Sequence, residues 1–268
     1  MRSLVEFYLM TMKMAVISQF QYRVANYFYM IGMIAEPVIY LVVWTTIAAS
    51  RPGGQVEGYS AGQLAAYYIV WTLVRNMNIV FTPFGWEHRI RQGELSGQLV
   101  RPIHPIHYDL AFFAGWKVVV IVLWLPIAAA LSLVFHPTLA LTPPKVVAFA
   151  LAIWGAYLIR SMFQSVLGMI TFYTTRVAAV FELYFAVELL LSGRLVPLAL
   201  LPDWAQRLSN WLPFQWTFFF PIQTLVGDLT VDQLVMGLMA QALWITAGAL
   251  LLSFAWRRAV RHYAAVGG

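Results

Sequence analysis

Seven polar or charged residues lie inside segments that are otherwise apolar, and they are the first candidates for chemistry. They are Glu36, Arg75, Asn76, Asn78, Arg160, Gln164 and Glu188. A charge near the centre of a bilayer costs about 2.5–3.5 kcal/mol on insertion scales, so such a position usually has a reason. One interpretation is a polar lining for a substrate path between subunits. The other is that the two glutamates form buried ion pairs with the two arginines, which would fix how the helices pack.

The local sequence around these residues adds detail without assigning the pairs. Glu36 stands directly before Pro37, which removes a helical hydrogen bond and favours a kink. Arg160 and Gln164 are four residues apart and therefore share one face of a helix. Both the lining and the pairing interpretation stay open at this point.

Motifs for known catalytic chemistry are absent from the sequence. It contains no G-x-x-x-x-G-K-[ST] phosphate loop, no H-E-x-x-H and no G-x-S-x-G. His88, His104 and His107 share one loop, but no acidic residue stands near them at a persuasive ligand spacing, and the chain has no cysteine. We therefore expect no catalytic residue, no metal site and no cofactor held by this chain itself.

The elements that position the seven residues are long apolar segments. Of 268 residues, 61% are hydrophobic and only 10% are charged, against about 25% charged in a typical soluble domain. A helix needs about 20 apolar residues to cross a bilayer. Six segments qualify, at residues 27–49, 61–84, 108–135, 145–172, 177–201 and 231–256. We predict an all-α polytopic membrane protein with one transmembrane domain over residues 1–268.

Basic residues outside the spans predict the orientation of this domain. One side carries Arg2, Lys13, Arg23, Arg89, Arg91, Arg101, Arg176, Arg257, Arg258 and Arg261. The other side carries only Arg51, Lys145, Arg194 and Arg207. The richer side is expected in the cytoplasm, together with both termini. The net charge of +6 thus reflects membrane topology, and we expect no nucleic-acid partner.

The segment before the first span has a different composition. Residues 2–24 mix apolar side chains with Arg2, Glu6 and Lys13, and are too polar to cross a bilayer comfortably. An amphipathic helix lying on the inner surface fits this pattern, and a solvated tail is the alternative.

The cytoplasmic loop between the second and third spans contains the stretch RIRQGELSGQLVRPIHP, residues 89–105. Trp86 and Ile90 form one small apolar face, Leu95 and Leu99 form another, and Gly93 lies between them. We expect two short helical pieces that meet at Gly93, with charged side chains free to dock on a soluble protein. The candidate docking residues are Trp86, Glu87, Arg89, Arg91, Gly93, Glu94, Leu95, Leu99 and Arg101. A bare positively charged loop is the alternative.

The outer segment, residues 202–229, contains two apolar pieces that are too short to cross the bilayer. Asp203 is expected to cap the first piece, which carries Trp204 and Trp211 on one face. The second piece is expected to stop at Pro221. We predict two short helices dipping into the outer leaflet, with a plain aromatic belt as the alternative. Residues 230–233, TVDQ, read as a capping box that opens the last span.

The order of these parts resembles the membrane subunit of an ABC-2-type ABC transporter, in a bacterial permease branch. The stretches that carry the likeness are GELSGQLVRPIHP, in the cytoplasmic loop, and LLSGRLVPLALLPDWAQRLSNWLPFQWTFFFPIQTLVGDL, before the last span. The likeness covers nearly the whole chain, and the layout is more specific than any single residue.

The resemblance implies partners and roles for several segments. Two permease subunits, identical or related, would pair in the bacterial inner membrane. Two copies of a separate ATPase, which would hold ATP and Mg²⁺, would bind beneath them. Residues 86–101 would couple the ATPase to an exporter for a lipid-like, amphiphilic or drug-like substrate. The outer gate would contain Trp211, Phe218, Phe219 and Phe220.

The resemblance also places the first and fifth spans at the subunit contact. Glu36 and Glu188 would then lie near the dimer axis, where carboxylates would suit a cationic or zwitterionic amphiphile. Two other function classes remain: an ion-coupled secondary transporter with Glu36 or Glu188 as the carrier, and a lipid-modifying membrane enzyme. The first would be favoured by inverted repeats and the second by a reactive constellation, and neither feature is visible in the sequence.

Overall fold

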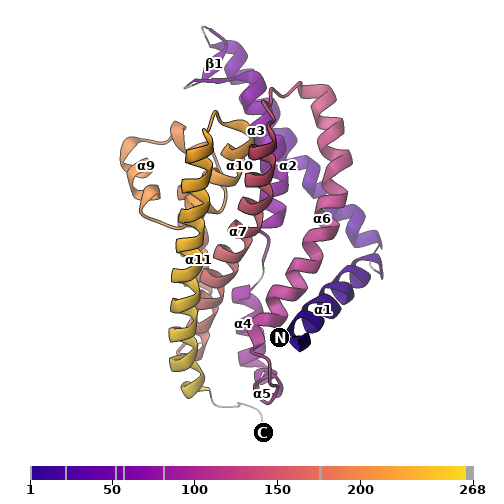
Figure 1. Cartoon of the computed structure of the whole chain (residues 1–268), viewed down its shortest axis with the longest axis vertical. Coiled ribbons are helices and arrows are strands. Elements are labelled where there is room, and N and C mark those ends of the chain that lie inside the picture. The colour runs from indigo at the N-terminus through magenta and orange to yellow at the C-terminus, as the bar shows by residue number, and fades with distance from the viewer. Residues whose placement is uncertain are drawn as a thin grey trace.

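Long, roughly parallel helices form the body of the protein, as the computed structural model shows (Figure 1). The structure describes residues 2–21, 23–51, 53–56, 58–80, 82–174 and 177–263. Four helical stretches are long and apolar enough to cross a membrane: Ala61–Arg91, Pro105–Phe135, Pro143–Phe172 and Val231–His262. The protein is therefore an all-α, multi-pass membrane protein.

Three predicted spans are continuous helices whose ends lie close to the expected positions. Helix α6 covers Pro105–Phe135 and helix α7 covers Pro143–Gly168, extended by the 3₁₀ helix η1, Met169–Phe172. Helix α11 covers Val231–Ala259, followed by η4, Val260–His262. The predicted capping box is confirmed at the start of α11, because Thr230 and Gln233 each accept a backbone N–H of the other.

The second predicted span, residues 61–84, falls within the candidate span Ala61–Arg91, but its helix is interrupted. Helix α3 covers Ala61–Met77 and is capped at its start by Ser60 and Gln63, while helix α4 covers Thr82–Arg91. The backbone is no longer helical after Asn78. Arg75, Asn76 and Asn78 therefore lie at a break between the two helices. Ahead of α3, a small hairpin pairs β1, Gln55–Val56, with β2, Tyr59–Ser60.

The fifth predicted span, residues 177–201, is one continuous helix only in its first half. Helix α8 covers Ala178–Leu191 and has 14 residues. At 1.5 Å per residue it is about 21 Å long, against roughly 30 Å for a bilayer core. The helix ends because Gly193 takes the left-handed conformation, with φ +79°, that glycine adopts without strain. Helix α2, Arg23–Ser50, covers the first predicted span. Four candidate spans lie in the part of the chain that the structure describes, so the count of six stays a prediction.

The outer segment contains two short helices, as predicted, with different boundaries. Helix α9 covers Asp203–Asn210 and helix α10 covers Phe219–Val226, with η2, Leu198–Leu200, and η3, Phe214–Trp216, beside them. Two expectations are wrong. Pro202 occupies the cap position and Asp203 lies in the first turn. Pro221 lies in the first turn of α10, where a missing N–H costs no hydrogen bond, and does not stop the piece.

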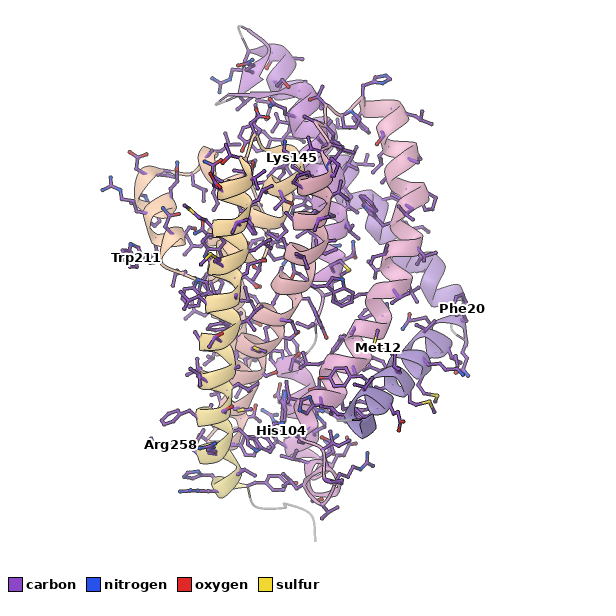
Figure 2. The ribbon with its side chains drawn as sticks, viewed as in Figure 1. Met12, Phe20, His104, Lys145, Trp211 and Arg258 are labelled. Atoms are coloured by element: carbon purple, nitrogen blue, oxygen red, sulfur yellow. The ribbon has the colours of Figure 1, made fainter. Side chains whose placement is uncertain are left out.

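The N-terminal helix α1, Arg2–Gln21, lies obliquely across the lower part of α6 (Figures 1 and 2). Gly115 of α6 permits this contact, because a Cβ there would lie 2.5 Å from the Met12 carbonyl oxygen. The opposite face of α1 is exposed and mixes Glu6 and Lys13 with apolar side chains, of which Leu9, Met14 and Phe20 are each more than 60% exposed. A helix is thus confirmed for residues 2–21, and its place on the membrane surface stays a prediction.

Helix α3 is the centre of the packed core. Almost every residue from Leu64 to Met77 is buried, against α2, α6, α7 and α10. Its aromatic side chains also hold the turn that follows α8. The Tyr67 hydroxyl donates to the Gly193 carbonyl at 2.7 Å, and the Trp71 Nε1 donates to the Arg194 carbonyl at 2.8 Å. This contact fixes the position of Arg194.

Candidate functional site

The break between α3 and α4 exposes backbone carbonyls that a continuous helix would satisfy internally. In a bilayer these groups need partners from the protein, because no water is available there. Lys117 of α6 is fully buried, and its ammonium donates to the Asn76 carbonyl at 3.3 Å and to the Ile79 carbonyl. A cation at this place also opposes the negative end of the α3 dipole.

Helix α7 supplies the remaining partners of the break. The Arg160 guanidinium donates to the Asn78 carbonyl. One turn later, the Gln164 amide lies 3.1 Å from the Val80 carbonyl and 3.1 Å from the same guanidinium, in the orientation that satisfies both contacts. Arg160 and Gln164 do share a helix face. Both side chains on that face donate to carbonyls that the break between α3 and α4 leaves unpaired.

Two ion pairs involve the candidate pathway residues. Arg160 and Glu188 form a bidentate pair between α7 and α8, with both N···O distances 2.7 Å and side chains 8% and 1% exposed. Glu36 and Arg75 pair at 2.5 Å between α2 and α3, with side chains 35% and 23% exposed. These contacts join glutamates to arginines as the pairing interpretation states, and the second pair remains accessible from outside the chain.

The two asparagines have different neighbours. Asn76 is buried and donates to the Thr72 carbonyl of its own helix at 2.7 Å. Asn78 is also buried, and its amide donates to the Thr217 carbonyl at 2.6 Å, which links the break to the outer segment.

A cavity of about 280 Å³ lies beside the break. Its lining comes from α3, α4, α7, α8 and the two segments that flank α9. The lining residues are Arg75, Ile79, Val80, Phe84, Arg160, Phe185, Arg194 and Phe218. Two of the seven polar residues predicted from the sequence, Arg75 and Arg160, therefore face one cavity together, while Glu188 lies behind Arg160.

The loop predicted to couple to an ATPase has the two helical pieces that were expected, and we call residues 82–101, which contain α4 and α5, the knob. Helix α5 covers Leu95–Leu99, and Gly93, with φ +74°, forms the joint. The Tyr263 hydroxyl, beyond the end of α11, donates to the Gly93 carbonyl at 3.2 Å. The knob and the end of α11 lie at the same end of the molecule, opposite β1 (Figure 1).

Three of the predicted docking residues are buried inside the protein. Trp86 and Leu95 are 0% exposed. Arg89 is 8% exposed and makes a bidentate pair with Asp109 of α6, at 3.0 and 2.7 Å. Within this chain the three side chains fasten the knob to the helices above it, and their part in docking stays a prediction.

Trp86 packs closely against α7 and α11. A Cβ at Gly168 of α7 would lie 2.9 Å from the Trp86 Cβ. The Trp256 ring of α11 packs edge-on against the Trp86 ring at 5.4 Å, and the Arg89 guanidinium lies 4.5 Å from that ring on another side. The knob thus contacts α7 and α11 as well as α6.

The surface of the knob comes from other residues. Glu94, Leu99 and Arg101 are exposed, and Glu87 pairs with Arg91 at 2.8 Å along α4. Val100, absent from the predicted set, is 84% exposed. Leu99 and Val100 therefore place two adjacent apolar side chains among charged ones on the surface of the knob.

The loop histidines have structural partners. The ring of His104 accepts the Ile106 N–H at 3.2 Å and thereby caps α6, while His107 contacts the Tyr8 hydroxyl at 2.8 Å. Burial, followed by the neighbouring His107, lowers the pKa of His104. Across the described ranges, no group of three or more His, Cys, Asp or Glu is placed to hold a metal ion.

Comparison with known proteins assigns this architecture to a family. The family model described as ABC-2 family transporter protein matches residues 6–267. The chain belongs to the ABC-2 transporter family. No curated protein matches it. An ABC-2 protein is the membrane subunit of an ABC transporter, and its partner in general is an ABC ATPase.

The residues predicted to form the outer gate of this ABC-2 permease differ in exposure and in the helices that they contact. Phe218 is buried, with the Arg160 and Arg194 guanidinium groups 5.8 and 5.7 Å from its ring. Phe220 packs so tightly on α11 that any Cβ at Gly237 would overlap its ring. Trp211, in contrast, is 82% exposed and lies at the periphery of the permease (Figure 2). Trp211 is therefore an exposed side chain, whereas Phe218 and Phe220 are buried.

Phe219 has a different neighbour from the other two phenylalanines. A Cβ at Gly193 would lie 2.8 Å from the Phe219 Cβ. The three phenylalanines thus contact the cavity arginines, the turn after α8, and α11 respectively, and only Phe218 lines the cavity.

Sequence reasoning missed three residues that the permease uses. Lys117 interrupts the third predicted span, and that interruption was the available signal. Arg194 was counted among the outer basic residues although it lies within the fifth predicted span, beside Gly193. Asp109 gave no signal, because its partner Arg89 is 20 residues away along an irregular loop.

Proposed function

We propose that this chain is the permease subunit of an ATP-driven exporter for a lipid-like, amphiphilic or drug-like substrate. It would pair with a second permease subunit, identical or related, in the bacterial inner membrane, with both termini in the cytoplasm. Two copies of a separate ATPase would hold ATP and Mg²⁺ and dock on the knob. Lipids would surround the exposed apolar faces.

The observation that carries this proposal is the mechanical continuity between the knob and the break. Helix α4 begins at Thr82, directly below the carbonyls that Lys117, Arg160 and Gln164 hold. Trp86 and Arg89 fix the same helix to α7 and α6. A displacement of the knob by an ATPase would therefore reach the polar contacts beside the cavity through one short helix.

A substitution on the exposed part of the knob tests this role. Val100→Asp should abolish ATP-dependent transport in vesicles that contain the ATPase, because it places a charge in an apolar contact without touching the core. The matched control is Leu139→Asp, an exposed apolar residue 37% accessible in the loop between α6 and α7. Normal transport by Val100→Asp would contradict the assigned docking role.

The secondary-transporter alternative predicts a different result in the same vesicles. Transport would persist without ATP and collapse with the proton gradient. Both candidate carriers, Glu36 and Glu188, are held in ion pairs with arginines of the same chain, so neither carboxylate is unpaired. This pairing favours the ATP-driven reading.

A further inference from the structure

We infer that the cavity beside the break binds the anionic group of an amphiphile, whose hydrocarbon part lies on the phenylalanines of the lining. Its role as a substrate site rests on the proposed export function. Binding itself does not, and the two can be tested separately.

The charges around the cavity favour an anion. Three arginines line it, at positions 75, 160 and 194. The two carboxylates nearby, Glu36 and Glu188, each already pair with one of these arginines. Among the described residues Arg194 has no ion pair with a carboxylate, and its guanidinium faces the Phe218 ring at 5.7 Å. The cavity therefore carries one uncompensated positive charge.

Arg75 adds an unused hydrogen-bond donor. One of its terminal nitrogens contacts Glu36, but its buried Nε has no hydrogen-bond partner among the described residues. Burying an unsatisfied donor costs free energy, and so does burying an unpaired charge. A carboxylate or phosphate oxygen in the cavity would reduce both costs, since arginine forms strong charge-assisted hydrogen bonds with such groups.

The remaining lining is apolar and opens to the outside of the chain. The rings of Phe84 and Phe185 stack at 6.1 Å with an interplanar angle of 21°, and Phe84 is 48% exposed. Ile79 and Val80 complete this side. At about 280 Å³ the cavity has room for a headgroup and the start of a chain, with the rest of the chain outside.

This arrangement argues against the cationic or zwitterionic amphiphile that the resemblance suggested. That expectation treated Glu36 and Glu188 as free acids near the dimer axis. Both carboxylates are instead neutralised by arginines, and Glu188 is 1% exposed. A cationic headgroup in the cavity would meet Arg194 with no free acid beside it.

Native mass spectrometry of the full chain in detergent tests the binding. The probes are phosphatidylglycerol, which is anionic, and phosphatidylethanolamine, which is zwitterionic, with identical acyl chains. The wild-type chain should retain the anionic lipid about tenfold better, the effect of one charge-assisted contact. Arg194→Gln should bring the two lipids to equal retention. Arg207→Gln, which removes an exposed charge on α9, should leave the preference unchanged.

Two results would overturn the inference. One is equal retention of both lipids by the wild-type chain, and the other is an unchanged preference in Arg194→Gln. A thermal unfolding curve for each variant checks that the fold is intact. If Arg194→Gln unfolds, Arg194→Lys replaces it. Lysine keeps the charge, so the preference should persist, and its loss in a folded Arg194→Lys chain would count against a charge-based site.

A second arm distinguishes a transported amphiphile from a resident lipid. In vesicles with the ATPase, fluorescent phosphatidylglycerol should change leaflet with ATP in the wild type and not in Arg194→Gln. Selective binding without ATP-dependent movement would support the site and overturn its role in transport. ATP-dependent transport of another amphiphile without selective binding would overturn the site and leave the permease assignment standing.

Discussion

The guanidinium of Arg160 and the carboxylate of Glu188 join α7 to α8 through two parallel hydrogen bonds of 2.7 Å each. The same guanidinium donates to the Asn78 carbonyl at the end of α3. One side chain therefore connects three segments that are distant in sequence. The pair thus ties α8, a helix of 14 residues, to α7 and to the break.

Removal of Glu188 should destabilise the permease more than removal of Glu36. Glu188→Gln leaves a buried guanidinium without its counter-charge, a loss of roughly 3–5 kcal/mol. Glu36→Gln should cost about 1 kcal/mol or less, because that pair is partly exposed. Unfolding of the two variants in detergent by increasing denaturant measures the difference. Equal losses would mean that the buried pair contributes no more than the exposed one.

Gly168→Ala should loosen the knob without touching its surface. The added Cβ would lie 2.9 Å from the Trp86 Cβ and 3.1 Å from the Pro83 Cα, and neither neighbour is the end of a flexible side chain. We expect a loss of about 1–3 kcal/mol and faster amide exchange in α4. Gly97→Ala is the control, since no atom lies within 4 Å of its added Cβ. Identical exchange in the two variants would argue against the contact.

Lys117→Met should destabilise the break between α3 and α4. The substitution keeps most of the side-chain volume and removes the donor to the Asn76 and Ile79 carbonyls. Unsatisfied carbonyls in a bilayer are costly, so the melting temperature should fall by several degrees. Lys13→Met on the exposed face of α1 provides the comparison. A fall of the same size in both would assign the effect to loss of charge alone.

Acid pH should weaken the start of α6 through His104. Its neutral ring accepts the Ile106 N–H, and burial lowers its pKa in the folded protein. The unfolded chain therefore binds a proton first, near pH 6.5, and stability falls as pH drops from there toward the folded pKa. Thermal unfolding at pH 7.5 and 5.0 should show this loss. His104→Asn, which can cap without titrating, should lose less, and an equal loss would exclude His104 as the cause.

The sequence predicted the helical pieces well wherever the local pattern was sufficient. The joint at Gly93 and the capping box at Thr230 depend on neighbours within four residues, and both were expected. The break after Asn78 was not expected, although Arg75, Asn76 and Asn78 interrupt the apolar pattern there. Lys117, Arg160 and Gln164, from other helices, satisfy the carbonyls that the break leaves unpaired.

The site was harder to predict than the fold for the same reason. Polar residues inside spans were visible, but the choice of partners depends on how helices cross. The burial of Arg89 by Asp109 and the position of Arg194 beside Phe218 both arise from contacts at long sequence separation. The resemblance suggested free carboxylates near the dimer axis, whereas the cavity in the structure is lined by three arginines.

The knob is assembled from parts spread over most of the chain. Its glycine joint is held by Tyr263, its tryptophan by Gly168 and Trp256, and its arginine by Asp109. A synthetic peptide copied from residues 82–105 would lose every one of these supports. Competitors of the ATPase contact would therefore have to be sought as antibodies or small proteins raised against the intact, membrane-embedded chain.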